Sequence, residues 1–220
     1  MSAGAAPPAK FRFGTVILAA GASTRMGTLK QLLEWEGRPL LVRAVEAALA
    51  SEAWPVVVVL GAQAEKIRPA LARLPVLVAE NPAWAEGMAA SLRTGITTLH
   101  QFSRSLDGAV VALCDQPAFS AAVIAQLVAA HQRSGRGIVA AHYSGRNGAP
   151  ALFTREHFPA LMSLTGEEGA RALLNGQPDR VAAVDWPELA VDFDTPEDIA
   201  RHQTAQTASR GDREDRSGNG

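Results

Sequence analysis

The chain alternates between short apolar runs of strand length and longer segments with helical periodicity, and this alternation limits its possible folds more than any other feature. The run at 55–60 (PVVVVL) is β-branched and apolar, as expected of a strand covered on both faces. The segment 40–51 instead places Leu41, Val45 and Ala48 on one helical face. Repeated strand–helix alternation is typical of a mainly parallel sheet with helices on both faces.

The same patterns define the remaining elements and the fold class. We expect further strands at 14–20, 76–79, 108–114, 137–141, 149–153 and 181–184. We expect further helices at 65–73, at 88–99, from Ser120 to His131, and from Thr195 onward. The sequence therefore predicts an α/β, Rossmann-like three-layer sandwich. Ligands in such folds bind at the carboxyl ends of the strands, which here means after Ala20, at Asp115, and near 146–150.

Length and composition limit the number of domains and the classes of function that the chain can have. In a chain of 220 residues we expect one domain at 13–205, a flexible N-terminal tail at 1–12 and a disordered C-terminal tail at 206–220. The 21 Lys and Arg residues and 22 Asp and Glu residues give a formal net charge of −1, which argues against a nucleic-acid binder. The single cysteine, Cys114, excludes an intrachain disulfide and a multi-cysteine zinc site, and we expect it in the core. No apolar run has the length of a membrane span or of a signal-peptide core, so we expect a cytoplasmic protein without membrane contact.

A loop rich in small residues follows the first strand, with the sequence LAAGASTRMGTLK at 18–30. Small residues let a ligand approach the backbone, whose N–H groups can bind anionic oxygens. Arg25 offers a planar fork for phosphate, and Lys30 a compact cation. No G-x-G-x-x-G occurs here, and Thr28 stands where a Walker A loop requires lysine. The alternative is a glycine turn with two solvated cations.

Acidic residues occupy two further positions. Asp115 ends an apolar strand, where a carboxylate faces the ligand edge of the sheet; the alternative is an Asp that caps the turn before Pro117. Asp192 and Asp194 precede the helix start at Thr195, and Asp194 could simply interact with the helix dipole. Two carboxylates from distant segments fit a metal that bridges phosphate oxygens.

The loop at 18–30 resembles the signature loop of an α/β nucleotidyltransferase family that includes sugar-1-phosphate, terpenoid and molybdenum cofactor enzymes. The resemblance implies that Arg25 and Lys30 neutralise the triphosphate and the departing pyrophosphate. It also implies phosphate binding by the loop backbone, at Ala19, Ala20, Gly21, Ala22 and Ser23.

The resemblance extends to the metal and the nucleoside. In this family a strand-end Asp in a D-x-P context binds Mg²⁺, which assigns the metal, Mg²⁺ or Mn²⁺, to Asp115. Asp194 best matches the acid that completes the metal site, with Asp192 in reserve. Gly87 and Ser91 match a segment that lies against base and ribose in similar transferases; the alternative is an Asn-Pro turn followed by an ordinary helix.

Two later segments resemble molybdenum cofactor cytidylyltransferases. The segment 145–153 is similar to their R-x-G-H-P-x-x-F pattern and implies substrate binding by Arg146, Gly148 and Pro150. Ala149 stands where that family usually has histidine, which puts in question the role of that imidazole toward the substrate. The segment 165–174 resembles a G-D-x-G-A-R-x-L-L pattern and implies a substrate contact by Arg171; the alternative for both arginines is a solvated surface cation.

The resemblance as a whole implies transfer of CMP from CTP to the phosphate of molybdopterin or molybdenum cofactor, with release of pyrophosphate. Arg25, Lys30 and Asp115 would be the catalytic residues, and LAAG rather than LAGG indicates cytidylyl transfer. A molybdenum hydroxylase is a possible recipient of the product. Two alternatives stay open: transfer to a sugar or polyol phosphate, and a non-catalytic cofactor chaperone for such a hydroxylase.

Overall fold

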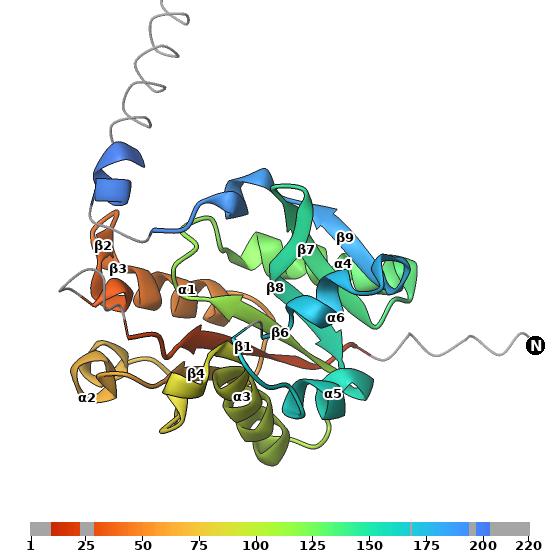
Figure 1. The fold of residues 1–220 in the computed structure, drawn as a ribbon, viewed down its shortest axis with the longest axis horizontal. Coiled ribbons are helices and arrows are strands. Elements are labelled where there is room, and N and C mark those ends of the chain that lie inside the picture. Colours follow the sequence, from red (N-terminus) through yellow and green to blue (C-terminus); the bar gives the residue numbers. More distant parts are fainter. Residues whose placement is uncertain (1–9, 23–28, 168, 194–196, 203–220) are drawn as a thin grey trace, which may run out of the picture.

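The computed structural model describes residues 10–22, 29–167, 169–193 and 197–202, which form a seven-stranded sheet with helices on both faces (Figure 1). The strand order is β5-β4-β1-β6-β8-β7-β9. A two-stranded ribbon, β2 (Glu34–Trp35) and β3 (Arg38–Pro39), lies apart from it. The strands of the large sheet are β1 (Phe13–Ala19), β4 (Val56–Leu60), β5 (Leu77–Glu80), β6 (Gly108–Leu113), β7 (Ile138–Tyr143), β8 (Arg146–Thr154) and β9 (Val181–Asp185).

The sheet is mainly parallel, so the predicted fold class is confirmed. β1 pairs in parallel with β4 and β6, and β7 pairs in parallel with β9, whereas β8 runs antiparallel to both of its neighbours. β8 begins at Arg146, three residues before the start predicted from its apolar run. The cause is a tight turn at Ser144 (φ 51°) and Gly145 (φ 71°), which pairs Arg146 with Tyr143 across a hairpin.

Helices cover the sheet in two layers, each over its own hydrophobic core. α1 (Leu40–Leu49) and α4 (Ala121–Ser134) pack on one face. α3 (Met88–Phe102), α5 (Phe158–Met162) and α6 (Arg171–Asn175) pack on the other. Residues 197–202 are helical, but the predicted start at Thr195 lies outside the described residues, as does most of the two predicted tails.

The short helices differ most from the predictions. The helix expected at 65–73 is divided into α2 (Ala64–Ile67) and a 3-10 turn at Arg68–Leu71, because Pro69 cannot donate a helical hydrogen bond. Ser120 caps α4 as predicted, accepting a hydrogen bond from the Val123 N–H at 3.4 Å. The other 3-10 turns are Lys30–Leu32, Trp84–Glu86, Arg155–His157, Pro178–Arg180 and Pro187–Ala190.

The strand order fixes where a ligand can bind. From β1 the chain moves outward to β4 and β5 on one side, and then returns to place β6 on the other side of β1. Such a switch point leaves a crevice at the carboxyl ends of the two central strands. Leu18 pairs with Leu113 in the ladder, and the Cys114 N–H donates to the Leu18 carbonyl at 3.3 Å. The loop after β1 and the residues after β6 therefore meet at this crevice.

In the part of the chain that the structure describes, no helix is both long enough and apolar enough to cross a bilayer.

Candidate active site

A glutamine anchors the loop that follows β1. Gln31 is 3% exposed and donates from Nε2 to the carbonyl oxygens of Ala19 at 3.0 Å and Gly21 at 2.8 Å. The Ala20 carbonyl accepts from the Ala62 N–H at 3.1 Å. These bonds direct successive carbonyl oxygens into the protein, which favours binding of anionic oxygens by the N–H groups of the same loop. Sequence analysis did not identify Gln31, because its role depends on two backbone oxygens ten or more residues away.

Only part of the predicted triphosphate loop can be placed. Gly21 is exposed and Ala22 is half-buried at the mouth of the crevice. Ser23 and Arg25, which sequence analysis assigned to phosphate binding, lie outside the described residues.

Lys30 and Asp115, predicted from segments far apart in sequence, form an ion pair at the crevice. Lys30 Nζ lies 2.8 Å from Asp115 Oδ2, and the two side chains are 16% and 20% exposed. The second carboxylate oxygen, Asp115 Oδ1, is buried and accepts no hydrogen bond from any described residue. A buried carboxylate oxygen without a partner is costly and is usually explained by a ligand, an ion or water. This oxygen is a hard donor of the kind that Mg²⁺ and Mn²⁺ prefer.

The C-terminal acidic segment lies beside Asp115. The Phe193 N–H donates to the Asp115 carbonyl at 3.2 Å, and the Phe193 ring packs on Trp35 with centroids 4.8 Å apart. Asp192 is exposed next to this contact. Asp194, the predicted second metal ligand, lies outside the described residues, within which no group of three or more His, Cys, Asp or Glu could hold a metal.

Cys114 belongs to the core rather than to the chemistry, as predicted. It is 7% exposed and packs in the cluster beneath α1 and α4. Burial, together with the negative charge of Asp115, raises the pKa of the Cys114 thiol well above its usual range. The thiol therefore stays protonated at neutral pH and is a poor nucleophile.

Gln116 joins the end of β6 to β7, to β8 and to the 3-10 turn at Pro187–Ala190. It is 5% exposed, and its Nε2 lies within hydrogen-bond distance of Tyr143 Oη (3.2 Å) and the carbonyls of Ala149 (3.0 Å) and Leu189 (3.1 Å). Tyr143 Oη in turn donates to the Ala149 carbonyl at 2.8 Å. This network fixes the backbone at the position where the family pattern has histidine.

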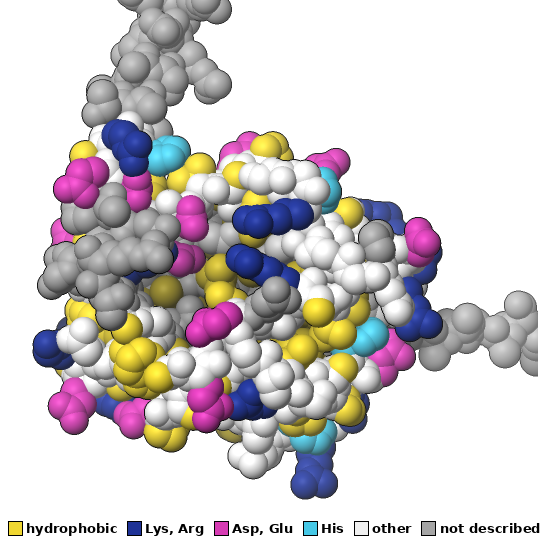
Figure 2. All heavy atoms as spheres, viewed as in Figure 1, with side chains coloured by type: hydrophobic (Ala, Val, Ile, Leu, Met, Phe, Trp, Pro, Cys, Tyr) yellow, Lys and Arg dark blue, Asp and Glu magenta, His cyan; other side chains and the backbone are white. Residues whose placement is uncertain are grey.

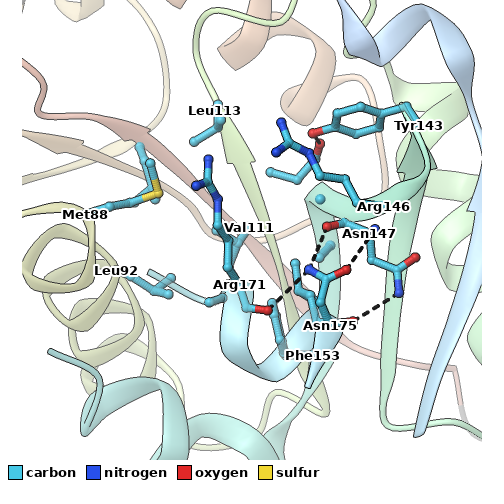
Figure 3. Close-up of a pocket in the computed structure, with 16 residues that line it drawn as sticks. Met88, Leu92, Val111, Leu113, Tyr143, Arg146, Asn147, Phe153, Arg171 and Asn175 are labelled. Atoms are coloured by element: carbon cyan, nitrogen blue, oxygen red, sulfur yellow. Dashed lines mark hydrogen bonds between the residues drawn. The ribbon is translucent and has the colours of Figure 1, made fainter. Parts of the chain in front are cut away.

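A pocket of about 110 Å³ opens beside this network, between β8, α3 and α6 (Figure 3). Three of the four residues predicted to contact substrate, Arg146, Gly148 and Arg171, line it, whereas the buried Pro150 does not. Both guanidinium groups extend toward Leu113, one from β8 and one from α6. Figure 2 shows basic side chains beside a hollow with an apolar floor on this face. Among the described residues, sixteen line the pocket, and they include these two arginines and no carboxylate.

Gly148 has no side chain, and the Tyr143 hydroxyl occupies the space where a side chain would lie. A Cβ atom at this position would lie 2.4 Å from Tyr143 Oη, closer than any real contact. The absence of a side chain therefore lets the Tyr143 hydroxyl pass over the strand and reach Ala149.

The segment predicted to contact the nucleoside opens α3. Gly87 has φ +105°, and a Cβ there would lie 2.8 Å from the Gly166 carbonyl, so the position favours glycine on two grounds. Ser91 is 5% exposed and accepts a hydrogen bond from Asn81 Nδ2 at 3.1 Å. In this structure Ser91 therefore holds the Asn-Pro turn against the helix.

Comparison with known proteins agrees with this geometry. A family model described as "MobA-like NTP transferase domain" matches residues 15–182. The chain is 34% identical over 197 residues to nicotine blue oxidoreductase from Paenarthrobacter nicotinovorans, an alignment that covers 84% of this chain and 94% of that protein. It is 31% identical over 196 residues to purine catabolism protein PucB from Bacillus subtilis, with 83% and 92% covered.

The chain is also similar in structure to a solved protein. The chain superposes on Rv0371c from Mycobacterium tuberculosis, in a structure described as a complex with manganese, with a TM-score of 0.68 and 27% identity, covering 86% of this chain and 97% of that chain. The family match spans more than half of the sequence, and the predicted resemblance is confirmed. The chain belongs to the family of MobA-like NTP transferase domains.

Proposed function

We propose that the protein transfers CMP from CTP to the phosphate of molybdenum cofactor and releases pyrophosphate. The observation that carries this proposal is the position of Asp115, whose buried Oδ1 has no described partner, between the phosphate loop and the pocket that contains Arg146 and Arg171. A triphosphate on the loop and an anionic acceptor in the pocket would meet at this carboxylate. The preference for CTP rests on the LAAG sequence at 18–21 and its resemblance to cytidylyltransferases.

The reaction needs alignment and charge neutralisation more than proton transfer. The acceptor phosphate is already ionised at neutral pH, so its oxygen can attack the α-phosphorus of CTP without a general base. A new P–O bond forms there while the bond to the bridging oxygen breaks, and the electron pair leaves with pyrophosphate. The enzyme then lowers the barrier by holding the two phosphates in line and by stabilising the leaving group.

Residues of the chain are assigned to these tasks. Lys30, together with Arg25 of the same loop, would neutralise the β- and γ-phosphates, and Arg146 and Arg171 would hold the acceptor. Mg²⁺ or Mn²⁺ held by Asp115 and Asp194 would supply charge neutralisation at the α-phosphate. The unpartnered Oδ1 of Asp115 supports this assignment. When nucleotide binds, Lys30 can turn from Asp115 toward phosphate, because the pair is already partly exposed.

A redox function is a second candidate, because the chain is 34% identical to a protein named as an oxidoreductase. Hydride transfer gives no role to a lysine–aspartate pair at a phosphate loop, so nucleotidyl transfer explains more of the site. The two functions differ in their products, because only transfer yields pyrophosphate.

Pyrophosphate release measured with each of the four NTPs against a panel of acceptors tests the proposal. The panel contains molybdenum cofactor, several sugar phosphates and a polyol phosphate, and oxidation of a nicotinamide nucleotide is followed in parallel. We expect release with CTP and molybdenum cofactor. Pyrophosphate release only with a sugar or polyol phosphate would mean that this compound, and not molybdenum cofactor, is the acceptor. Nicotinamide oxidation without pyrophosphate release would support the redox function. Binding of the nucleotide product without turnover would support the chaperone alternative.

A further inference from the structure

The two pocket arginines lie at the first residues of two neighbouring elements: β8, which the hairpin pairs with β7, and the short helix α6. Arg146 opens β8 directly after a tight turn, and Arg171 opens α6, a helix of five residues. A helix this short is unstable alone and depends on tertiary contacts. Leu174 provides one such contact, since it is 4% exposed in the core beneath α3. Leu173 and the preceding Ala170 are partly buried against the same cluster. Apolar contacts of this kind set the depth of the helix but form no directional bond to β8.

Two asparagines supply the missing constraint (Figure 3). The Asn147 N–H donates to Asn175 Oδ1 at 3.1 Å, and Asn175 Nδ2 donates to the Asn147 carbonyl at 3.1 Å. This exchange of both bonds repeats the pattern of a hydrogen-bonded pair in an antiparallel sheet. The carboxamide of Asn175 therefore pairs with the first part of β8 as a neighbouring strand would.

Each end of this contact adjoins one arginine. Asn175 Nδ2 also donates to the carbonyl of Arg171 itself at 3.2 Å, and Asn147 directly follows Arg146. The Asn147 side chain also forms hydrogen bonds. Its Nδ2 donates to the Leu174 carbonyl of α6 at 3.0 Å, and its Oδ1 lies 3.1 Å from Nδ1 of His142 in β7. Asn175 thus bonds to β8 through its oxygen and its Nδ2, and the same Nδ2 bonds back to Arg171 within α6.

We infer that Asn147 and Asn175 are positioning residues that fix Arg146 and Arg171 as a single site for one dianionic phosphate monoester. Two guanidinium groups directed into one pocket, where no described lining residue carries a carboxylate, repel one another until an anion lies between them. Such groups bind phosphate through paired, charge-assisted hydrogen bonds whose strength depends on orientation. The inference rests on the proposed function, in which this pocket holds the acceptor.

Methyl phosphate is a suitable probe because it is the smallest phosphate monoester. Its affinity is measured by phosphorus NMR titration, with a non-hydrolysable CTP analogue and Mg²⁺ filling the nucleotide loop. We expect Asn175→Ala to weaken binding about tenfold, the equivalent of about 1.4 kcal/mol. The control is Gln177→Ala, an exposed position two residues further on that does not line the pocket, which should leave the affinity unchanged.

A double-mutant cycle separates positioning from general stability. If Asn175 acts through the arginines, adding Asn175→Ala to Arg171→Gln lowers the affinity for methyl phosphate little further. If Asn175 instead has an independent structural effect, the loss of affinity in the double variant equals the sum of the two single losses. Thermal unfolding of each variant shows whether global stability is kept, and amide hydrogen exchange over 171–175 shows whether α6 remains folded. Wild-type affinity in Asn175→Ala, full additivity in the cycle, or no binding of methyl phosphate by the wild-type protein would each overturn the inference.

Turnover distinguishes this inference from the proposed function. In the assay of pyrophosphate release, Asn175→Ala should raise the acceptor KM and leave the CTP KM unchanged. A protein that binds methyl phosphate as described but transfers no nucleotide contradicts the proposed function alone. A protein that transfers nucleotide with an unchanged acceptor KM in Asn175→Ala contradicts the inference alone.

Discussion

Asp115 shows how much of the site depends on single atoms. One of its carboxylate oxygens is paired with Lys30 at 2.8 Å, and the other is buried without a described partner. The second oxygen therefore lacks a hydrogen-bond partner among the described residues, and the proposed Mg²⁺ or Mn²⁺ would provide one. Cys114, one residue earlier in the turn after β6, is buried in the core and takes no part.

Substitution of the lysine tests the pair at the nucleotide end. Lys30→Ala should lower kcat by about 10²–10³-fold, the range found when a preorganised charge-stabilising donor is removed. The matched control is Lys66→Ala, because Lys66 is an exposed lysine whose Nζ contacts Gln63 and no acid. Pyrophosphate release and thermal unfolding are measured together. A folded Lys30→Ala protein that turns over at close to the wild-type rate would exclude this role.

Gly148 yields a prediction about the acceptor side. The β-methyl group of Gly148→Ala would lie 2.4 Å from Tyr143 Oη and must displace it, which breaks the bond to the Ala149 carbonyl. We expect the free energy of unfolding to fall by about 1–3 kcal/mol, as in other overpacked sites, and the acceptor KM to rise. Adding Tyr143→Phe should restore part of the stability, since it removes the nearest clashing atom and leaves the ring Cζ, which would lie 2.8 Å from the added methyl group. Chemical denaturation of both variants checks this, and unchanged stability in Gly148→Ala would refute the steric argument.

Among the elements, α3 lies unusually close to the sheet. A Cβ at Gly95 would lie 2.3 Å from Val16 Cγ1 and 3.0 Å from Val59 Cγ2, both on buried strands. Alanine is favoured over glycine in a helix by about 1 kcal/mol, so propensity alone would make Gly95→Ala stabilising. The clash is with stiff β-branched side chains, and we expect it to prevail, with a net loss of about 1–3 kcal/mol. Denaturant unfolding measures this, with Thr97→Ala on the same helix as control; a more stable Gly95→Ala protein would refute the prediction.

Asp107 ties together the ends of three strands. Its Oδ2 accepts from the Arg12 N–H at 2.8 Å before β1, and its carbonyl accepts from the Arg155 N–H at 2.8 Å after β8. Burial would raise the pKa of Asp107, but hydrogen bonds from Arg12 and the charges of Arg12 and Arg155 outweigh it, so the pKa is lowered. A lowered folded-state pKa stabilises the protein above the unfolded pKa of 3.8, and this stability is lost as the pH falls through the folded-state pKa.

The consequence is a stability difference that depends on pH. Asp107→Asn should reduce the free energy of unfolding at pH 7 by about 1 kcal/mol or less, since the Asp107 side chain is 40% exposed and screened by solvent. The difference from wild type should shrink as the pH falls below 3.8. Unfolding curves at a series of pH values measure it, and a difference that grows toward low pH would contradict the assignment.

For the whole molecule, sequence was sufficient for the layout and insufficient for the details that complete the site. Apart from Thr15, the runs at β1, β4 and β6 carry no polar side chain because helices cover both faces, and this pattern placed Lys30 and Asp115 at one edge. The early start of β8 was not predicted, since Arg146 and Asn147 carry no apolar signal and pair only because of the turn before them. Gln31, Gln116 and Asn175 act through backbone atoms distant in sequence, and no local pattern marks such contacts.

The net charge of the chain is close to zero, but positive charge is concentrated at the pocket. A net charge of −1 excludes a broad basic surface, yet the pocket brings two arginines together, and none of its described lining residues carries a carboxylate. The proposed anionic acceptor would supply the compensating charge. This arrangement predicts that acceptor binding weakens as ionic strength rises, which acceptor KM values at several salt concentrations would measure; a KM independent of salt would count against an anionic acceptor.

The most direct test of the central claim follows the α-phosphate of CTP. The protein is incubated with CTP labelled at that phosphorus, Mg²⁺ and molybdenum cofactor, and the label is located by chromatography while pyrophosphate is measured. We predict that the label moves to the acceptor in equal amount to pyrophosphate, and that Asp115→Asn lowers the rate by at least about 10²-fold while Lys66→Ala does not. Failure of the folded wild-type protein to transfer label from any NTP to any phosphate acceptor would contradict the account.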